Sequence, residues 1–283
     1  MMIDVHTHTF PEHIAKRALQ KLIENAGDTL APVSDGTVAG LLQAMRAARV
    51  DRAVLCPVAT RAEQSADILA EACAIRDGER GEDASRHLIP LASVHPADPK
   101  WAKRLQAVAD ADIRGVKIHP YYQAFVLDAP GTLAFLKKCC DLNLIVLCHC
   151  GYDIGFPRDP ICGPERVARV IREIPDLRFI AAHLGGWMDW EASVNHLLGE
   201  SVFLDTSVLH HGAEDPNALR ILREHDPAKL LFATDAPWTS FDDGIRFIRA
   251  AGFSAEVETA IFGDNARRLF ALREEAFAKR PDA

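Results

Sequence analysis

Short runs of valine, isoleucine and leucine recur along the chain, and longer segments with apolar residues at helical spacing separate them. The runs predict strands at residues 2–6, 52–57, 88–94, 114–119, 144–149, 177–183, 202–206 and 230–235. The segments between them predict helices near residues 37–48, 63–78, 99–110, 130–142, 164–173, 190–198, 215–225 and 242–250. Eight strands that alternate with eight helices are typical of a (β/α)8 barrel, the TIM barrel. We therefore expect an α/β protein with a single TIM-barrel domain over residues 1–283.

A doubly wound open sheet is the alternative fold for alternating strands and helices. It would usually carry a glycine-rich turn after the first strand, whereas this chain has histidines there. Residues 252–283 predict extra C-terminal helices that pack on the barrel. The longest connections, 9–36 and 150–163, follow the carboxyl ends of strands, where a barrel builds its active site. These two segments are predicted to be substrate loops.

Composition and charge exclude several classes of protein. Hydrophobic residues make up 48% of the 283 residues, and the net charge of −8 with no long basic run argues against a nucleic-acid surface. No apolar stretch approaches about 18 residues, so no membrane span is expected. The N-terminus lacks the pattern of a secretory signal. Seven cysteines, an odd number without framework spacing, indicate reduced thiols in a cytoplasmic protein.

Histidine and aspartate residues stand at the carboxyl ends of several predicted strands. His6 and His8 close the first strand, and because strand side chains alternate, they are expected to point the same way. Strands five, six and eight end at His149, His183 and Asp235. The inward residue at the carboxyl end of each barrel strand lines the mouth of the active site. The sequence therefore predicts that these side chains meet on one rim.

This set of residue types favours a catalytic metal site. The predicted ligands are His6, His8, His149 and Asp235, and imidazole nitrogen with one carboxylate oxygen suits one Zn²⁺, with Mn²⁺ or Fe²⁺ as alternatives. A catalytic metal keeps one position open for water and lowers its pKa to about 7. Asp235 is expected to take a proton from that water, and His183 to orient the water or polarise the substrate. Cys148 and Cys150 flank His149, but alternation turns them toward the core instead.

The fourth strand carries two more candidates on one face, Lys117 and His119. Three interpretations of Lys117 are open: it is carbamylated and bridges two metals, it binds a substrate carboxylate, or it pairs with an acidic side chain. His119 is expected to support a ligand or to touch substrate. Asp205, near the end of the seventh strand, is expected to hydrogen-bond a ligand histidine.

Residues in the loops after the strands are candidates for binding substrate. Arg61 follows the second strand and Arg158 the fifth, and together with Lys117 they predict an anionic, carboxylated small molecule if they face the cavity. Aromatic residues that follow inward strand ends predict apolar walls; they are Phe10, Tyr121, Trp187 and Trp238.

The motifs and their order resemble the amidohydrolase superfamily, in particular the amidohydrolase-related family that includes aminocarboxymuconate-semialdehyde decarboxylase. The resemblance rests on His6-Thr7-His8, His149, His183, the segment Thr234 to Trp238, and a C-terminal motif, Gly263 to Phe270. It implies a TIM barrel with one metal held by His6, His8, His149 and Asp235, and with His183 acting on water or substrate. Lys117 departs from this pattern, because binuclear relatives place a carbamylated lysine there.

The family contains hydrolases, hydratases and decarboxylases, so fold and metal site do not choose the reaction. Our first hypothesis is a metal-dependent hydrolase that cleaves a C–N or C–O bond, in an amide or lactone, of a small carboxylated molecule. The alternative is a metal-dependent non-oxidative decarboxylase of an unsaturated or aromatic acid. A TatD-type nuclease would carry a glutamate on strand four, where this chain has Lys117. A metal-free binding protein is the non-enzyme alternative. A homo-oligomer remains open.

Overall fold

The computed structural model describes residues 1–27, 29–207 and 212–272. Within these residues, parallel strands form two sheets, one in the order β1-β2-β3 and one in the order β4-β5-β6-β7-β8. The strands are β1 (Ile3–Thr7), β2 (Arg52–Leu55), β3 (Leu88–Pro90), β4 (Gly115–Ile118), β5 (Ile145–Cys148), β6 (Phe179–Ala181), β7 (Phe203–Asp205) and β8 (Leu230–Leu231).

Backbone hydrogen bonds join the two sheets on both sides. Lys117 N donates to Ala92 O at 2.9 Å, which links the segment after β3 to β4. On the other side, Val5 N donates to Phe232 O and Asp235 N donates to His6 O, both at 2.9 Å. The strands of the described residues therefore close into a ring, which is the arrangement of a TIM barrel. The predicted fold class is confirmed.

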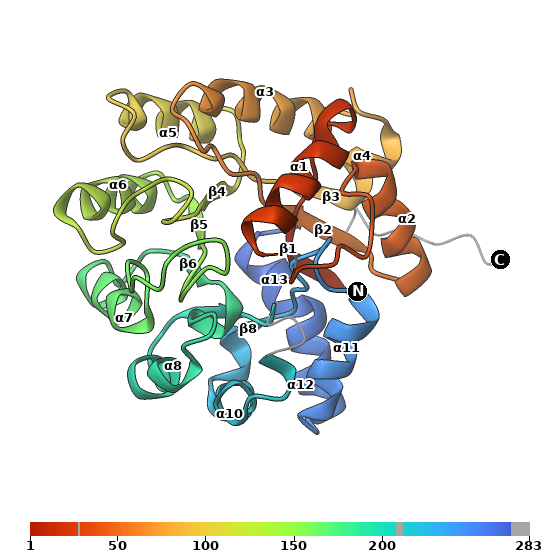
Figure 1. The fold of residues 1–283 in the computed structure, drawn as a ribbon, viewed down its shortest axis with the longest axis vertical. Coiled ribbons are helices and arrows are strands. Elements are labelled where there is room, and N and C mark those ends of the chain that lie inside the picture. The colour runs from red at the N-terminus through yellow and green to blue at the C-terminus, as the bar shows by residue number, and fades with distance from the viewer. Residues whose placement is uncertain (28, 208–211, 273–283) are drawn as a thin grey trace.

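Helices surround the strands, as Figure 1 shows. The helices that follow the strands in turn are α2 (Val38–Ala48), α3 (Gln64–Arg76), α5 (Trp101–Asp110), α6 (Pro130–Asp141), α7 (Pro164–Glu173), α8 (Trp190–Leu197), α10 (Pro216–Glu224) and α11 (Phe241–Ala250). Additional helices are α1 (Glu12–Asn25), α4 (Glu82–His87), α12 (Ala255–Thr259) and α13 (Asn265–Leu269), with short turns at η1 (His183–Gly185), η2 (Pro227–Lys229) and η3 (Ala260–Asp264). The predicted extra C-terminal helices are present up to residue 272, and the rest of that segment lies outside the described residues.

Two apolar clusters make up the core. One fills the barrel and contains alternate residues of the strands, such as Val54 and Cys56 of β2 and its end, or Ile145 and Leu147 of β5. The other lies between the strands and the helices. Cys148 and Cys150 belong to the outer cluster, so the prediction that they face away from His149 is confirmed. Both are free thiols.

A bulge in β1 sets the direction of the first histidine. The register with β2 shifts between Asp4 and Thr7, so that Val5 and His6 together oppose Val54. Val5 packs in the barrel interior, and strict alternation would turn His6 outward. The bulge brings His6 to the same side as Val5. Asp4 stabilises it by accepting a hydrogen bond from His6 N at 2.8 Å.

Strand β8 is shorter than the predicted 230–235. Its backbone pairing with β7 ends at Leu231. Beyond Leu231, hydrogen bonds to side chains take the place of backbone–backbone hydrogen bonds to β7. Ala233 N donates to Thr206 Oγ1 at 3.0 Å, and Thr234 Oγ1 donates to Asp4 Oδ2 at 2.6 Å. Asp235 then adopts the left-handed conformation, with φ of 60°. Such a conformation is unfavourable for a non-glycine residue and is common at functional sites.

The C-terminal motif has a structural role. A Cβ at Gly263 would lie 2.1 Å from Met1 O, so only glycine allows the chain start to pack there. Asn265 Nδ2 donates to Pro227 O at 2.8 Å and to Leu230 O at 2.7 Å. These bonds fix the turn before β8, the strand that leads to Asp235.

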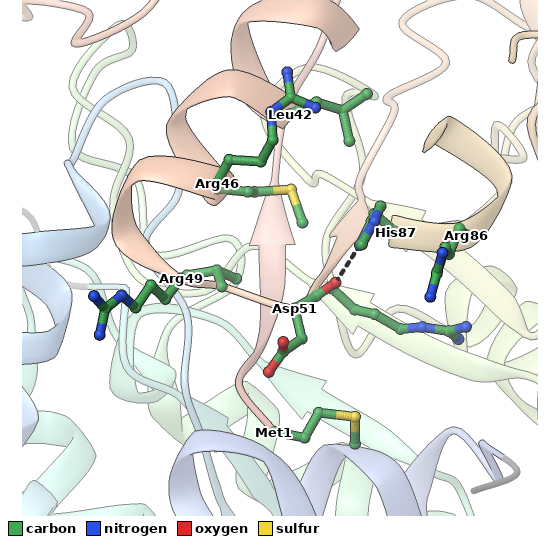
Figure 2. A pocket seen from close by; sticks show the side chains of 10 residues that line it. Met1, Leu42, Arg46, Arg49, Asp51, Arg86 and His87 are labelled. Carbon is green, nitrogen blue, oxygen red and sulfur yellow. Dashed lines mark hydrogen bonds between the residues drawn. The ribbon is translucent and has the colours of Figure 1, made fainter. Parts of the chain in front are cut away.

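Two further observations concern the molecule's surface. None of the helices in the described part of the chain is long and apolar enough to cross a membrane. A pocket of about 490 Å³ lies beside residues that precede β1, β2 and β3. Figure 2 shows that Arg46 and Arg49 there point in different directions, while His87 bonds to the backbone of Asp51. The pocket therefore lacks a convergent set of catalytic groups.

Candidate metal centre

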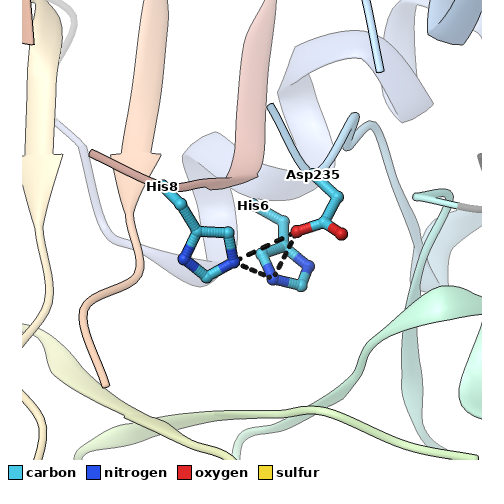
Figure 3. Close-up of side chains that lie close together, drawn as sticks. All are labelled: His6, His8 and Asp235. Atoms are coloured by element: carbon cyan, nitrogen blue, oxygen red, sulfur yellow. Dashed lines mark hydrogen bonds and ion pairs between the residues drawn. The ribbon is translucent and has the colours of Figure 1, made fainter. Parts of the chain in front are cut away.

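Three side chains converge at the carboxyl ends of β1 and β8. His6 Nε2 and His8 Nε2 are 3.2 Å apart, and Asp235 Oδ1 lies 3.4 Å from the first and 3.1 Å from the second. Figure 3 shows the three groups pointing at one another. A tetrahedral metal at about 2.0–2.1 Å from its ligand atoms holds those atoms about 3.3 Å apart. The donor types and their spacing therefore fit a metal ion between them.

Hydrogen bonding aims His6 at this centre. Its Nδ1 lies 2.9 Å from Asp205 Oδ2, and because a carboxylate oxygen only accepts, Nδ1 carries the hydrogen. The lone pair of the neutral ring is therefore on Nε2, toward His8 and Asp235. A carboxylate behind a ligand histidine is a common support in metal sites. The predicted hydrogen bond of Asp205 to one of these histidines is confirmed, and the role of His6 as a metal ligand stays a prediction.

The electrostatics also suit metal binding. Burial lowers the pKa of His6 far below its ordinary value, and the charge on Lys117 lowers it further, so the ring is neutral at pH 7. Burial alone would raise the pKa of Asp235, but His6 and His8 beside it lower the pKa overall. Asp235 is therefore ionised. Neutral imidazoles and an ionised carboxylate are the forms that bind metals.

Lys117 lies in the same centre. Its side chain is almost completely buried, and its Nζ is 2.7 Å from His6 Nε2. Two carboxylates, Asp205 and Asp235, flank His6 on either side, so positive charge at Lys117 is balanced nearby. The Lys117 amine therefore contacts His6 Nε2, the nitrogen that would bind a metal. Carbamylation of Lys117 and a second, bridged metal stay predictions.

His149 and His183 form a second, adjoining group. His183 Nε2 lies 3.0 Å from His149 Nδ1, while His183 Nδ1 donates to Ser207 O at 2.7 Å. His183 has a φ of 61°, so like Asp235 it adopts the left-handed conformation just after a strand. Asp205 accepts from His183 N at 2.8 Å and thereby connects the two groups. One carboxylate thus positions both His6 and His183.

His119 stacks on His149, with ring centroids 4.1 Å apart and planes at 11°. Asp153 Oδ2 lies 3.4 Å from His119 Nε2, so these three residues form a further group of metal-ligand type. The structure thus places His149 beside His119, and brings His6, His8 and Asp235 together without it. That His149 is a ligand of the same metal stays a prediction. Burial lowers the pKa values of His119 and His149 far below the ordinary value.

A cavity of about 1130 Å³ opens above these groups. Its lining includes all the predicted ligands, Lys117, His119 and His183, and the predicted wall residues Phe10, Trp187 and Trp238. Tyr121 is buried but does not line it; the neighbouring Tyr122 does.

The two predicted arginines lie elsewhere. Arg61 and Arg158 are exposed and do not line the cavity. The guanidinium of Arg158 stacks 4.1 Å from the ring centroid of Tyr152, and one of its nitrogens donates to Met188 O. Both arginines follow the correct strands, but loop side chains have no alternation rule that fixes their direction. Of the three predicted cations, only Lys117 faces the cavity.

Sequence reasoning missed several residues of the site. Tyr122 and Asp153 line the cavity from the segments after β4 and β5, and Ser207 bonds to the ring of His183. Helix α1 also lines the cavity, within a segment predicted as a loop. Its apolar residues at a spacing of four, such as Ile14, Ala18 and Leu22, were the available signal.

Comparison with known families identifies the class of this protein. The model of the family described as amidohydrolase matches residues 3–272. The chain therefore belongs to the amidohydrolase family, and the resemblance seen in its motifs is confirmed. It is an enzyme fold with a candidate metal site. No protein of curated function matches the sequence.

Solved structures share the fold at low identity. The 5-carboxyvanillate decarboxylase from Sphingomonas paucimobilis is 17% identical with a TM-score of 0.67, and the match covers 96% of this chain and 99% of that one. The enzyme of the same name from Novosphingobium aromaticivorans, complexed with manganese and 4-hydroxy-3-methoxy-5-nitrobenzoic acid, is 14% identical, with a TM-score of 0.65 and coverage of 96% of each chain. A probable 2-pyrone-4,6-dicarboxylic acid hydrolase from Acinetobacter baumannii with citric acid bound is 18% identical, with a TM-score of 0.64 and coverage of 95% and 99%.

Proposed function

We propose that this protein is a metal-dependent, non-oxidative decarboxylase of a small unsaturated or aromatic carboxylic acid. The observation that carries the proposal is the buried amine of Lys117 beside the His6, His8 and Asp235 cluster, on the floor of a cavity with aromatic walls. The fold shared with two 5-carboxyvanillate decarboxylases supports it. The choice reverses the order of our two sequence-based hypotheses.

Each group in the site has a part in holding such a substrate. We propose that His6, His8 and Asp235 hold a divalent metal, Zn²⁺ or Mn²⁺. This metal would supply positive charge that attracts the substrate carboxylate. Lys117 adds a second positive group at the same place. A planar, conjugated substrate suits the flat surface of the stacked His119 and His149 rings.

The reaction replaces CO₂ by a proton on carbon. The bond between the carboxylate carbon and the substrate breaks, its electron pair stays on the substrate, and a proton takes the vacated position. Asp235 and His183 both line the cavity, and in this proposal they move that proton. The proposal predicts that no water is consumed.

Isotope labelling tests this reaction. Carboxylated aromatic and unsaturated acids, including carboxylated lactones that hydrolysis would open, are incubated with the metal-loaded enzyme in D₂O or in H₂¹⁸O. CO₂ release is measured together with the isotope content of the product. We expect one deuterium at the decarboxylated carbon and loss of CO₂ release in Asp235→Asn that still binds metal. Incorporation of solvent ¹⁸O into a ring-opened product, without CO₂, would contradict the proposal.

Hydrolysis is the second candidate, because one observation favours it. Asp235 is ionised and adjoins the position of the metal, so it is suited to accept a proton from an attacking water. The fold is also that of a probable pyrone dicarboxylic acid hydrolase. The ¹⁸O measurement above separates the two reactions with the same set of substrates.

A further inference from the structure

One face of α1 lines the active-site cavity along the length of the helix. The lining residues are Ile14, Ala18 and Leu22 of α1, and Ala26 directly after its end; they follow one another at a spacing of four, so they form a single stripe. Twelve residues of helix span about 18 Å. The cavity therefore continues well beyond the metal centre.

Other helices supply the remaining walls of this extension. Val38 and Leu42 of α2 and Ile68, Ala72 and Ile75 of α3 also line the cavity, and all are apolar. We call the extension bounded by these residues and the α1 stripe the apolar arm. Alanines at positions 18, 26 and 72 leave space that larger side chains would fill. Ile14, Ala18, Leu22 and Ile68 are only half-buried, although helix packing normally covers such residues.

The volume of the cavity exceeds the volume that the proposed head group would fill. Cavities for drug-sized ligands are about 300–1,000 Å³, and this one is about 1130 Å³. A single-ring acid at the metal centre would leave the arm empty. Apolar surface left open to water is unfavourable by about 25 cal/mol per Å². An occupant of the arm would remove that cost.

The charged residues around the apolar arm exclude an anionic group from it. The charged residues that line the cavity near α3 are Asp67, Glu71 and Arg80. Arg80 makes three hydrogen bonds to Glu71, at 2.7, 2.9 and 3.1 Å, so its charge is already neutralised. A phosphate or nucleotide tail would need unpaired cations, and this region has more acids than bases. An uncharged alkyl tail fits the lining.

We propose that the substrate is an amphipathic carboxylic acid, with its carboxylated head at the metal centre and a long unbranched apolar tail in the arm. The head assignment rests on the proposed function, whereas the tail assignment rests on the arm. An extended chain advances about 1.2 Å per bond. The α1 stripe therefore accommodates a tail of roughly ten to fifteen carbons.

Equilibrium binding of saturated alkanoic acids from six to sixteen carbons tests the arm without any turnover. We expect the Kd of the metal-loaded enzyme to fall by up to about fourfold per added methylene until the arm is full. Ala18→Trp should abolish this chain-length dependence, so that hexanoate and dodecanoate bind this variant with similar Kd values. Ala70→Trp, at an exposed α3 position outside the lining, is the matched control and should behave like the wild type.

Leu22→Glu provides a second variant that adds charge to the arm without bulk, and it should weaken dodecanoate more than hexanoate. Thermal melts establish that each variant is folded. A Kd independent of chain length, or an equal effect of Ala18→Trp and Ala70→Trp, would overturn the arm proposal. Because these measurements require no reaction, a failure of the decarboxylase proposal would appear only in the CO₂ assay.

Discussion

Asp205 connects the two halves of the site at the level of single atoms. One of its carboxylate oxygens accepts from His6 Nδ1 and the other from His183 N. It thereby fixes the tautomer of one histidine and the backbone position of the other. Asp205 bonds to Nδ1 of His6, while His6 Nε2 points toward His8 and Asp235. We therefore expect Asp205 to affect a metal at that cluster through the orientation of His6.

Asp205→Asn should therefore weaken metal binding by about 10- to 100-fold, since the amide replaces a charged acceptor behind His6. Competition with a chelator of known affinity measures the change. Asp98→Asn is a suitable control, because Asp98 is also buried but pairs with Arg104 away from the cavity. Equal metal affinities in the two variants would show that Asp205 does not orient a ligand.

At the scale of elements, the end of α10 carries a buried histidine outside the site. His225 Nε2 donates to Val202 O at 2.9 Å, which joins the helix end to the residue before β7. Its Nδ1 is buried, and the described structure offers it no hydrogen-bond partner. Burial lowers the pKa of His225 below its ordinary value. The folded protein therefore binds a proton here less readily than the unfolded chain.

The free energy of unfolding should therefore depend on pH through His225. As pH falls through about 6.5, the unfolded chain takes up a proton that the folded state resists, so His225 contributes stability at higher pH that is lost on acidification. His225→Gln keeps a donor for Val202 and removes the titration. Urea unfolding between pH 8 and pH 5 should show a shallower loss of unfolding free energy in the variant. Parallel pH profiles would contradict this expectation.

Element positions were largely predictable, and the exceptions have physical causes. Helices such as α2 and α3 begin and end within a few residues of their predicted bounds, because their apolar faces pack on the barrel. The helix α1 has the same periodicity, but a (β/α)8 pattern assigns one helix to each strand, so 9–36 was predicted as a loop. The predicted 230–235 strand shortened because Thr206 and Asp4 side chains took over its hydrogen bonds.

At the scale of the whole molecule, metal binding should stabilise the fold. A metal that binds only the folded protein adds about 2.7 kcal/mol at 100 times its Kd. Addition of Mn²⁺ or Zn²⁺ to chelator-treated protein should therefore raise the Tm, and removal should lower it and abolish activity. His8→Ala, which removes one of the predicted ligands, should show little metal-dependent shift in calorimetry. An equal shift in this variant would place the ion elsewhere.

The candidate site was predictable in its residues and less so in its arrangement. The positions of His6, His8 and Asp235 at strand ends were enough to bring them together. Strand alternation alone did not reveal the bulge that turns His6 inward, because a one-residue register shift leaves no mark in the apolar pattern. The stacking of His149 on His119 and the outward orientation of the Arg158 side chain depend on loop conformation, which local sequence does not specify.

The closure between β1 and β8 has a consequence for the order in which the protein matures. Two of the converging groups, His6 and His8, leave the ribosome more than 200 residues before Asp235. At about 5–20 residues per second, that interval is on the order of 10–50 seconds. During it, the nascent chain exposes two histidines without the carboxylate of Asp235. The metal is therefore expected to load after translation of β8, as the final step of assembly.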